Sequence, residues 1–274
     1  MKMPVVNTAE LKAGICIPAA GPWFEGHFPG KPILPGVAEL AFAIAALRHE
    51  TGKPLPLRGI VFARLRHLVL PGDRLELSAR QSAGADGEPE RLRFELQRDG
   101  VLVANGEFMV GAPLSQSDAS PDRRTRTSLR GNSPAGNFPS LDTLLPHRPP
   151  MRFVESILQQ SAEGLDCVAR VPARCALVVD GAPVLAAIEA AAQAAAVWEA
   201  LQRWHQHGEG APRVGYLVAM RDITFFTDSI PADQPLFVSV RLQAVSPPLS
   251  HYRFDVSLEG SHLVQGTVGT YLAA

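Results

Sequence analysis

A histidine at position 27 lies in a turn whose backbone is restrained by prolines and glycines. Residues 26–37 read Gly-His-Phe-Pro-Gly-Lys-Pro-Ile-Leu-Pro-Gly-Val, and an apolar run follows directly. Pro29, Pro32 and Pro35 fix the backbone φ at three points, so this turn is stiffer than an ordinary loop. An imidazole accepts protons well near neutral pH because its unperturbed pKa is about 6.5. The sequence therefore predicts a general base held rigidly beside the N-terminus of a helix.

The second group that could do chemistry is Glu189, which lies in an alanine-rich run with the periodicity of a helix. Its neighbours are almost all Ala, Val, Leu and Ile. Burial among such side chains raises the pKa of a carboxyl group and favours its protonated form, so Glu189 is a candidate general acid. Gln193 follows one helical turn later and can orient the carboxyl group by a hydrogen bond. The alternative, a surface glutamate on an alanine-rich helix, stays open.

The segment around His27 is similar to the signature of hot-dog-fold 3-hydroxyacyl-[acyl-carrier-protein] dehydratases of the FabZ/FabA type. The resemblance implies that His27 is the catalytic base and that the backbone N–H of Gly36 polarises the thioester carbonyl. Phe28 and Pro35 are supporting residues of the same string. The family carries an acidic residue fourteen positions after the histidine, and that position is Ala41 here. The first half alone should therefore lack its acid.

Glu39 is the acidic residue nearest to the missing position, but it precedes Ala41 by two residues. Two residues correspond to about 200° around a helix of 3.6 residues per turn. We therefore expect Glu39 to face away from the site, either toward solvent or as a first-turn carboxylate that suits the helix dipole.

The second half supplies the missing acid. Residues 183–193 resemble the segment Pro-Gly-Val-Leu-x-x-Glu-Ala-x-Ala-Gln, which carries the family's acid and its supporting glutamine, at Glu189 and Gln193 here. The histidine position fourteen residues earlier is Cys175, and Val184 takes the glycine position. No histidine lies near Cys175 in the sequence, so we expect an inert packed cysteine rather than a nucleophile.

The losses in the two halves are complementary. In dimers of this family, each active site takes its histidine from one subunit and its acid from the other. The resemblance therefore implies an internal pseudo-dimer with one composite site, in which His27 faces Glu189. The second pocket would contain only Ala41 and Cys175 and would be inactive.

Residues 145–151, Leu-Pro-His-Arg-Pro-Pro-Met, resemble the segment Leu-Pro-His-Arg-x-Pro-Phe that opens many such dehydratases. Two separate hot-dog proteins with these features, the ApeI and ApeP types, occur together in aryl polyene pigment biosynthesis. The chain resembles that pair fused. His147 belongs to the segment, and we assign it no chemical role.

The pattern of each half, one long helix and several antiparallel strands, predicts an α+β double hot-dog fold. Each half would contribute an antiparallel sheet wrapped around its long helix, and the two sheets would join edge to edge. The expected domains are residues 1–111 and 140–274, joined by a flexible Ser-, Pro-, Gly- and Arg-rich linker at 112–139. The expected helices are 35–49 and 183–204, and the expected strands are 11–18, 60–70, 74–81, 91–98, 101–109, 153–159, 165–171, 216–227, 236–244, 252–258 and 263–272.

Composition narrows the classes of function. The 274 residues carry a net charge of −1, which argues against a nucleic-acid partner. Cys16, Cys167 and Cys175 form no Cys-x-x-Cys pair, and their odd number without a secretory signal favours a reducing cytoplasm. No segment reaches the roughly 18 uninterrupted apolar residues of a membrane span. His205 and His207 are two residues apart on a helix and would not face each other, so we expect no metal site there.

The expected reaction is dehydration of (3R)-hydroxyacyl-[acyl-carrier-protein] thioesters to trans-2-enoyl thioesters, in fatty-acid or polyene and polyketide-type biosynthesis, without cofactor or metal. The acyl carrier protein is the expected partner, together with a ketosynthase or other synthase component, or a second copy of the chain. Two alternatives stay open. The chain could be an inactive hot-dog scaffold that binds acyl chains or carrier protein, or a hot-dog thioesterase.

Overall fold

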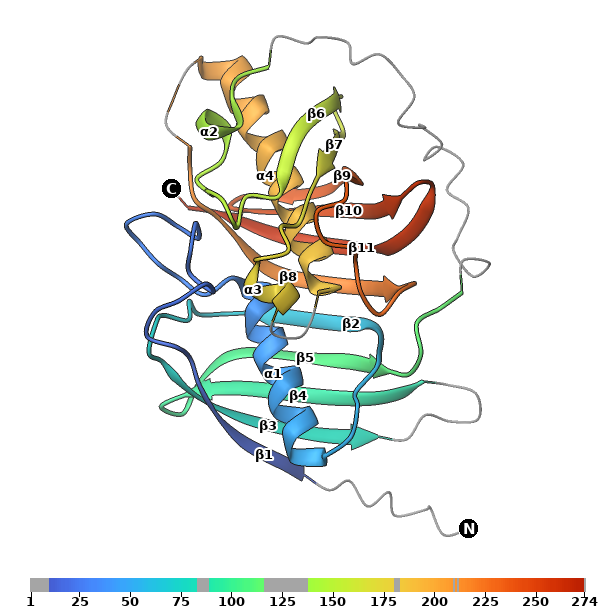
Figure 1. Cartoon of the computed structure of the whole chain (residues 1–274). Coiled ribbons are helices and arrows are strands. Elements are labelled where there is room, and N and C mark those ends of the chain that lie inside the picture. The colour runs from blue at the N-terminus through green and yellow to red at the C-terminus, as the bar shows by residue number, and fades with distance from the viewer. Residues whose placement is uncertain are drawn as a thin grey trace.

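A computed structural model of the chain describes residues 10–82, 89–115, 138–179, 183–208, 210 and 212–273 (Figure 1). Most of the linker expected at 112–139, namely residues 116–137, lies outside the described residues. None of the helices in the described ranges is both long enough and apolar enough to cross a membrane.

The two long helices and the strands follow the predicted order in both halves. In the N-terminal half they are β1 (Glu10–Cys16), α1 (Gly36–Thr51), β2 (Leu57–Leu65), β3 (Arg74–Ser82), β4 (Glu90–Arg98) and β5 (Val101–Val110). In the C-terminal half they are α2 (Leu141–Leu144), β6 (Val154–Gln160), β7 (Gly164–Ala169), α3 (Ala176–Val179), α4 (Leu185–His207), β8 (Gly215–Phe225), β9 (Leu236–Ser246), β10 (Leu249–Leu258) and β11 (Ser261–Leu272).

The strands form one continuous eleven-stranded sheet in the order β1-β3-β4-β5-β2-β8-β11-β10-β9-β7-β6. The two halves meet where β2 pairs antiparallel with β8, with Ile60 opposite Ile223 and Ala63 opposite Met220. This pairing satisfies the backbone of two strands that would otherwise be exposed sheet edges. The expectation that two hot-dog sheets join edge to edge is confirmed.

The two long helices lie against the sheet, α1 over the strands of the N-terminal half and α4 over those of the C-terminal half (Figure 1). Helix α4 packs closely because its inward face carries small side chains, and the alanines there are completely buried: Ala186, Ala187, Ala190, Ala191, Ala194 and Ala195. Helix α1 ends at Thr51, and its C-cap residue Gly52 has a φ of 61°, the left-handed conformation common after helices. The helices also contact each other, and residues of both line one cavity.

Two local predictions differ from the structure. The strand expected to continue to Leu70 ends at Leu65, and the exposed residues 66–68 instead border the central cavity. The short helices α2 and α3 were not predicted, because a single turn is too short to show helical periodicity. Ser140 caps α2, its hydroxyl accepting a hydrogen bond from the backbone N–H of Thr143 at 3.3 Å.

Gly59 lies at the junction of the two halves, and we predict that Gly59→Ala destabilises the protein. A Cβ at this position would lie 2.1 Å from the carbonyl oxygen of Ile223 on β8. The backbone must therefore shift, and we expect unfolding free energy to fall by about 1–3 kcal/mol. Thermal unfolding compared with Gly14→Ala tests this, because a Cβ at Gly14 on β1 meets nothing within 4 Å. Equal melting temperatures for the two variants would contradict the prediction.

Candidate active site

A cavity of about 290 Å³ lies between the two halves and is lined by residues of both. His27 and Gly36 come from the N-terminal half, and His147, Glu189 and Gln193 come from the C-terminal half. His27 and Glu189 are only 7% and 4% exposed. One ring nitrogen of His27, one of His147 and a carboxylate oxygen of Glu189 all lie within 4.8 Å of one another. The structure thus brings together the two residues that the sequence pointed to.

His27 is held by its own turn. Its Nδ1 lies 3.0 Å from the carbonyl oxygen of Ile33, which can only accept, so Nδ1 carries the proton and Nε2 keeps its lone pair. The ring stacks on Phe28 with centroids 4.2 Å apart. Burial, followed by the charge of His147, lowers the pKa of His27 to about 4. The imidazole is therefore neutral near pH 7 and can accept a proton.

Gly36 is the first residue of α1, so its N–H has no partner within the helix. Pro35 precedes it as the N-cap residue, and the Pro35 carbonyl accepts the N–H of Ala38 at 2.8 Å. A Cβ on Gly36 would lie 2.3 Å from Cδ1 of Leu65, which also lines the cavity. The lack of a side chain thus leaves room for the Gly36 backbone beside the cavity, at the positive end of the helix dipole.

Gln193 connects Glu189 to the segment that precedes β6. Its Nε2 donates to Oε1 of Glu189 at 3.0 Å and to the carbonyl oxygen of Met151 at 2.7 Å. Its Oε1 accepts the backbone N–H of Phe153 at 2.8 Å. All of these groups are buried, and together they fix the amide and therefore the carboxyl group of Glu189.

His147 is the site residue that the sequence reasoning missed. It is 6% exposed, and its Nε2 lies 3.5 Å from Oε1 of Glu189. Its ring is 5.3 Å from that of His27 and meets the ring of Phe28 edge-on at 4.7 Å. Its Nδ1 is buried and has no hydrogen-bond partner among the described residues. The only signal for it in the sequence was its place in the segment 145–151.

The expectation that Glu189 has a raised pKa is wrong. Burial alone raises it, but the hydrogen bond and charge of His147, then the charge of His27 and the hydrogen bond of Gln193, bring the pKa below its ordinary value. Glu189 is therefore a carboxylate near neutral pH. His147, His27 and Gln193 thus favour the ionised form of Glu189.

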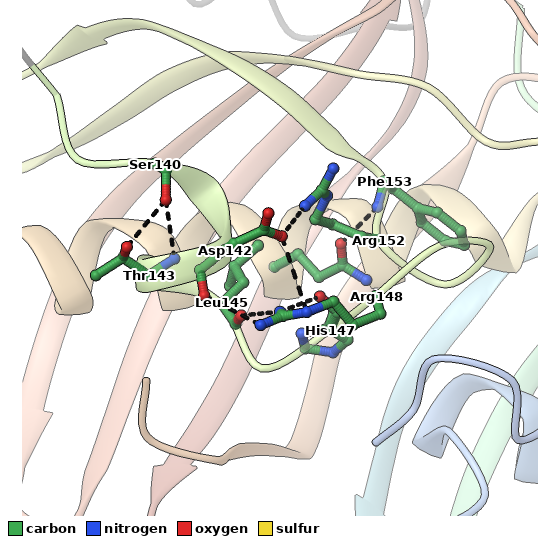
Figure 2. A network of polar contacts seen from close by, with 9 residues as sticks. Ser140, Asp142, Thr143, Leu145, His147, Arg148, Arg152 and Phe153 are labelled. Atoms are coloured by element: carbon green, nitrogen blue, oxygen red, sulfur yellow. Dashed lines mark hydrogen bonds and ion pairs between the residues drawn. The ribbon is translucent and has the colours of Figure 1, made fainter. Parts of the chain in front are cut away.

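The segment that carries His147 is braced by its own polar contacts (Figure 2). The Arg148 guanidinium donates to the carbonyl oxygens of Leu145 at 2.7 Å and His147 at 2.9 Å, and Asp142 pairs with Arg152. The backbone N–H of Arg148 donates to the carbonyl oxygen of Gly26 at 3.0 Å. The turn before His27 and the turn after His147 are thus in direct backbone contact.

Glu39 is in the first turn of α1, as one alternative held, but it does not face solvent. It is 3% exposed and lines the same cavity as His27. Burial raises the pKa of Glu39 well above its ordinary value, with a partial offset from Arg98. Its Oε2 has no hydrogen-bond partner within the described ranges. The expectation that it faces away from the site is wrong, because Glu39 lines the cavity together with His27 and residues 66–68.

The positions of the expected second pocket carry no ionised group. Cys175 is completely buried, and its thiol donates to the sulfur of Met151 at 3.6 Å. Burial raises the pKa of Cys175, which keeps it a thiol. Ala41 lies on α1 and is also buried.

Models of two protein families match the chain. One, described as ApeI-like, ApeI dehydratase, matches residues 5–107, and the other, described as ApeP-like, ApeP dehydratase, matches residues 139–274. Each family model thus covers one half of the sheet and one long helix.

Curated relatives match a stretch of the chain about as long as one hot-dog domain. The 3-hydroxyacyl-[acyl-carrier-protein] dehydratase FabZ of Myxococcus xanthus is 39% identical over 107 residues, which are 36% of this chain and 69% of the relative. FabZ of Sorangium cellulosum is 38% identical over 104 residues, 35% of this chain and 66% of the relative. The chain therefore spans about two thirds of the length of these relatives.

Solved structures match the whole chain. The dehydratase domain of PpsC from Mycobacterium tuberculosis has a TM-score of 0.65 at 14% identity and covers 100% of this chain and 96% of that chain. A putative thioesterase from Novosphingobium aromaticivorans has a TM-score of 0.59 at 17% identity and covers 96% of each. At these identities the likeness establishes the double hot-dog fold and does not distinguish a dehydratase from a thioesterase.

We predict that Gln193→Ala lowers the free energy of unfolding by about 2–4 kcal/mol, because buried groups left without a hydrogen-bond partner cost roughly 1–3 kcal/mol each. The groups affected are the Phe153 N–H, the Met151 carbonyl and the Glu189 carboxylate. Chemical denaturation compared with Gln206→Ala, an exposed position on the same helix, measures the difference. If both variants unfold at the same denaturant concentration, Gln193 does not hold the site together.

Proposed function

This chain belongs to the FabZ-type family of 3-hydroxyacyl-[acyl-carrier-protein] dehydratases, with an ApeI-like half fused to an ApeP-like half, and on that premise we propose that it works through one composite site. The proposed reaction converts (3R)-hydroxyacyl-[acyl-carrier-protein] thioesters to trans-2-enoyl thioesters. The observation that carries the proposal is the meeting of His27 and Glu189, from different halves, in one buried cavity.

The thioester carbonyl would accept a hydrogen bond from the Gly36 N–H at the start of α1. Removing the C2 proton places negative charge on the carbonyl oxygen. A backbone N–H at a helix N-terminus stabilises such charge without reorganising, because its dipole is already oriented. Pro35 supports this role by fixing where α1 begins.

His27 would take the C2 proton on Nε2. Its Nδ1–H, bonded to the Ile33 carbonyl, keeps the ring in the tautomer that leaves Nε2 unprotonated, and stacking on Phe28 holds the ring plane. The electrons of the C2–H bond pass toward the carbonyl oxygen and then form the C2–C3 double bond as the C3–O bond breaks.

The leaving hydroxide would take a proton from the pair formed by Glu189 and His147. A carboxylate by itself has no proton to give, so in this step the pair would carry one added proton, with His147 as an imidazolium. Transfer of that proton to the hydroxide, directly or through the Glu189 oxygen 3.5 Å away, would leave a neutral imidazole beside the carboxylate. Gln193 keeps the carboxylate in place. Water departs, and the proton now on His27 returns to the pair, since the two imidazole rings are 5.3 Å apart. The cycle then restarts with no net change in the protein.

The cavity wall fits an acyl chain. Ala192 and Ala196 line it along α4 beyond Glu189, and Leu34 and Leu217 line other sides. The small alanines leave space along the helix, and the apolar surface suits a hydrocarbon. We propose the acyl carrier protein as the partner that delivers this chain. We also predict a ketosynthase or other synthase component, or a second copy of the chain, as a further partner. A cytoplasmic location is a separate prediction, and three free cysteines are consistent with it.

We further propose that residues 1–111 and 140–274 act as two domains and that the pocket of Ala41 and Cys175 does no chemistry. A buried thiol paired with a methionine sulfur has neither the basicity nor the access that the reaction needs. The halves then share one reaction, each supplying what the other lacks.

The experiment that tests the function is mass spectrometry of a 3-hydroxyacyl-[acyl-carrier-protein] incubated with the chain, followed over time. We expect loss of water from the acyl group, and His27→Ala or Glu189→Gln should slow it by about 10²–10⁴-fold, the usual contribution of a general acid or base. His147→Gln should slow it as well, while His49→Gln, at an exposed position on α1, should not.

Other outcomes of this assay would contradict the proposed function. Release of free 3-hydroxy acid would favour a thioesterase. Binding of acyl carrier protein without any change in acyl mass, over short, long and aryl-capped chains, would favour an inactive scaffold. Full activity of His147→Gln would remove His147 from the proton path and leave Glu189 as the acid.

Cys175→Ala gives a separate test of the second pocket. We expect the rate of water loss to equal that of the unmodified chain, because the thiol is buried and un-ionised. The same mass-spectrometric assay measures it, with His27→Ala as the inactive reference. A large loss of rate in a variant that folds normally would show that the second pocket participates.

A further inference from the structure

The three side chains that meet in the cavity are also of the types that bind transition-metal ions. Two imidazoles and one carboxylate, each with its ligand atom within 4.8 Å of the other two, are all buried. Protein zinc sites use this combination, with three protein ligands and an open fourth position. Burial matters here, because exposed groups lose much of their affinity to competition from water.

The spacing is close to that of a bound ion. Zinc lies about 2.0–2.2 Å from imidazole nitrogen and carboxylate oxygen, so two ligands of a tetrahedral ion are about 3.3–3.5 Å apart. The separation of His147 Nε2 from Glu189 Oε1 is 3.5 Å. His27 completes the set after a movement on the order of 1 Å, the difference between that spacing and the 4.8 Å limit on the separations.

Two of the three ligands already have the hydrogen bonds that support metal ligands. Such histidines usually donate their other ring N–H to a carbonyl or carboxylate, and ligating carboxylates are themselves hydrogen-bonded. His27 Nδ1 donates to the Ile33 carbonyl, which leaves the lone pair of Nε2 free for a metal. Gln193 Nε2 donates to Oε1 of Glu189. These bonds fix the direction of the lone pairs before any ion arrives.

We propose that His27, His147 and Glu189 form a binding site for one zinc ion per chain. The fourth position faces the acyl cavity, where water or a substrate oxygen would complete the coordination. Imidazole ligands favour zinc and its transition-metal neighbours over magnesium or calcium, which prefer oxygen ligands. Magnesium at millimolar concentration therefore does not occupy the site.

Zinc at this site inhibits dehydration, a consequence that rests on the proposed function. The ion takes the His27 lone pair that would accept the C2 proton and occupies the Glu189 oxygen that faces His147. It also stands where the substrate's C2 and C3 would lie. Zinc and acyl substrate therefore compete, and a chelator restores the activity.

The experiment uses the full chain without a histidine tag, stripped with a chelator and desalted, and measures bound metal by equilibrium dialysis against zinc sulfate. We expect one zinc per chain, and cobalt in its place should give the intense visible absorption of a tetrahedral site. His147→Gln should weaken zinc binding by more than about 100-fold, since even a hydrogen-bond partner behind a ligand contributes about 10–100-fold.

Matched variants test whether other histidines of the chain bind the zinc. His49→Gln and the double variant His205→Gln, His207→Gln change exposed or helix-end residues and should keep the zinc stoichiometry. Circular dichroism establishes that His147→Gln is folded, and Glu189→Gln provides a second, nearly isosteric loss of a ligand. Two results would overturn the site. One is no zinc bound by the unmodified chain at micromolar free metal, and the other is zinc binding by His147→Gln and Glu189→Gln that is as tight as in the unmodified chain.

The binding measurement contains no substrate, so it separates this inference from the proposed function. Stoichiometric zinc with no dehydration in metal-free protein leaves the metal site standing and removes the proposed reaction. Dehydration that is unaffected by zinc at concentrations that fill the site overturns the inhibition.

Discussion

The site depends on one contact between the two halves, the hydrogen bond from the Arg148 N–H to the Gly26 carbonyl. Gly26 has a φ of 80°, and a Cβ there would lie 1.9 Å from the Arg148 carbonyl oxygen, so no other residue permits the two turns to approach this closely. His27 and His147 each adjoin one of these two residues. The backbone contact therefore brings both imidazoles to the same cavity.

The continuous sheet holds the two halves in the relative position that this contact requires. Pairing of β2 with β8 fixes the register between the halves, and α1 and α4 then begin close to the cavity they share. Gly36 at the start of α1 and Glu189 in the first turns of α4 are positioned by this geometry. In a dimer of separate chains the same arrangement would depend on concentration, whereas here one chain carries both halves and their assembly is intramolecular.

Polar groups in the cavity are mostly satisfied, and the exceptions are informative. The Ile33 carbonyl accepts a hydrogen bond from His27, and the Gln193 amide donates one to Glu189. His147 Nδ1 and Glu39 Oε2 are buried with no partner among the described residues, although both side chains line the cavity. An unpartnered buried polar group costs about 1–3 kcal/mol, which a polar ligand group can recover on binding. The folded chain is thus prepared for a ligand that is not purely hydrocarbon.

The sequence by itself determined the residues with strong local signatures: the turn around His27, the acidic residue Glu189 with Gln193 one turn later, and the order of the long helices and the strands. These follow from backbone restraint and periodicity, which act over a few residues. Only the tertiary structure decided that His147 meets Glu189, that Glu189 is ionised, and that Glu39 is buried. Each of these depends on charges or cover from segments distant in sequence, and Coulomb and burial effects act through space rather than along the chain.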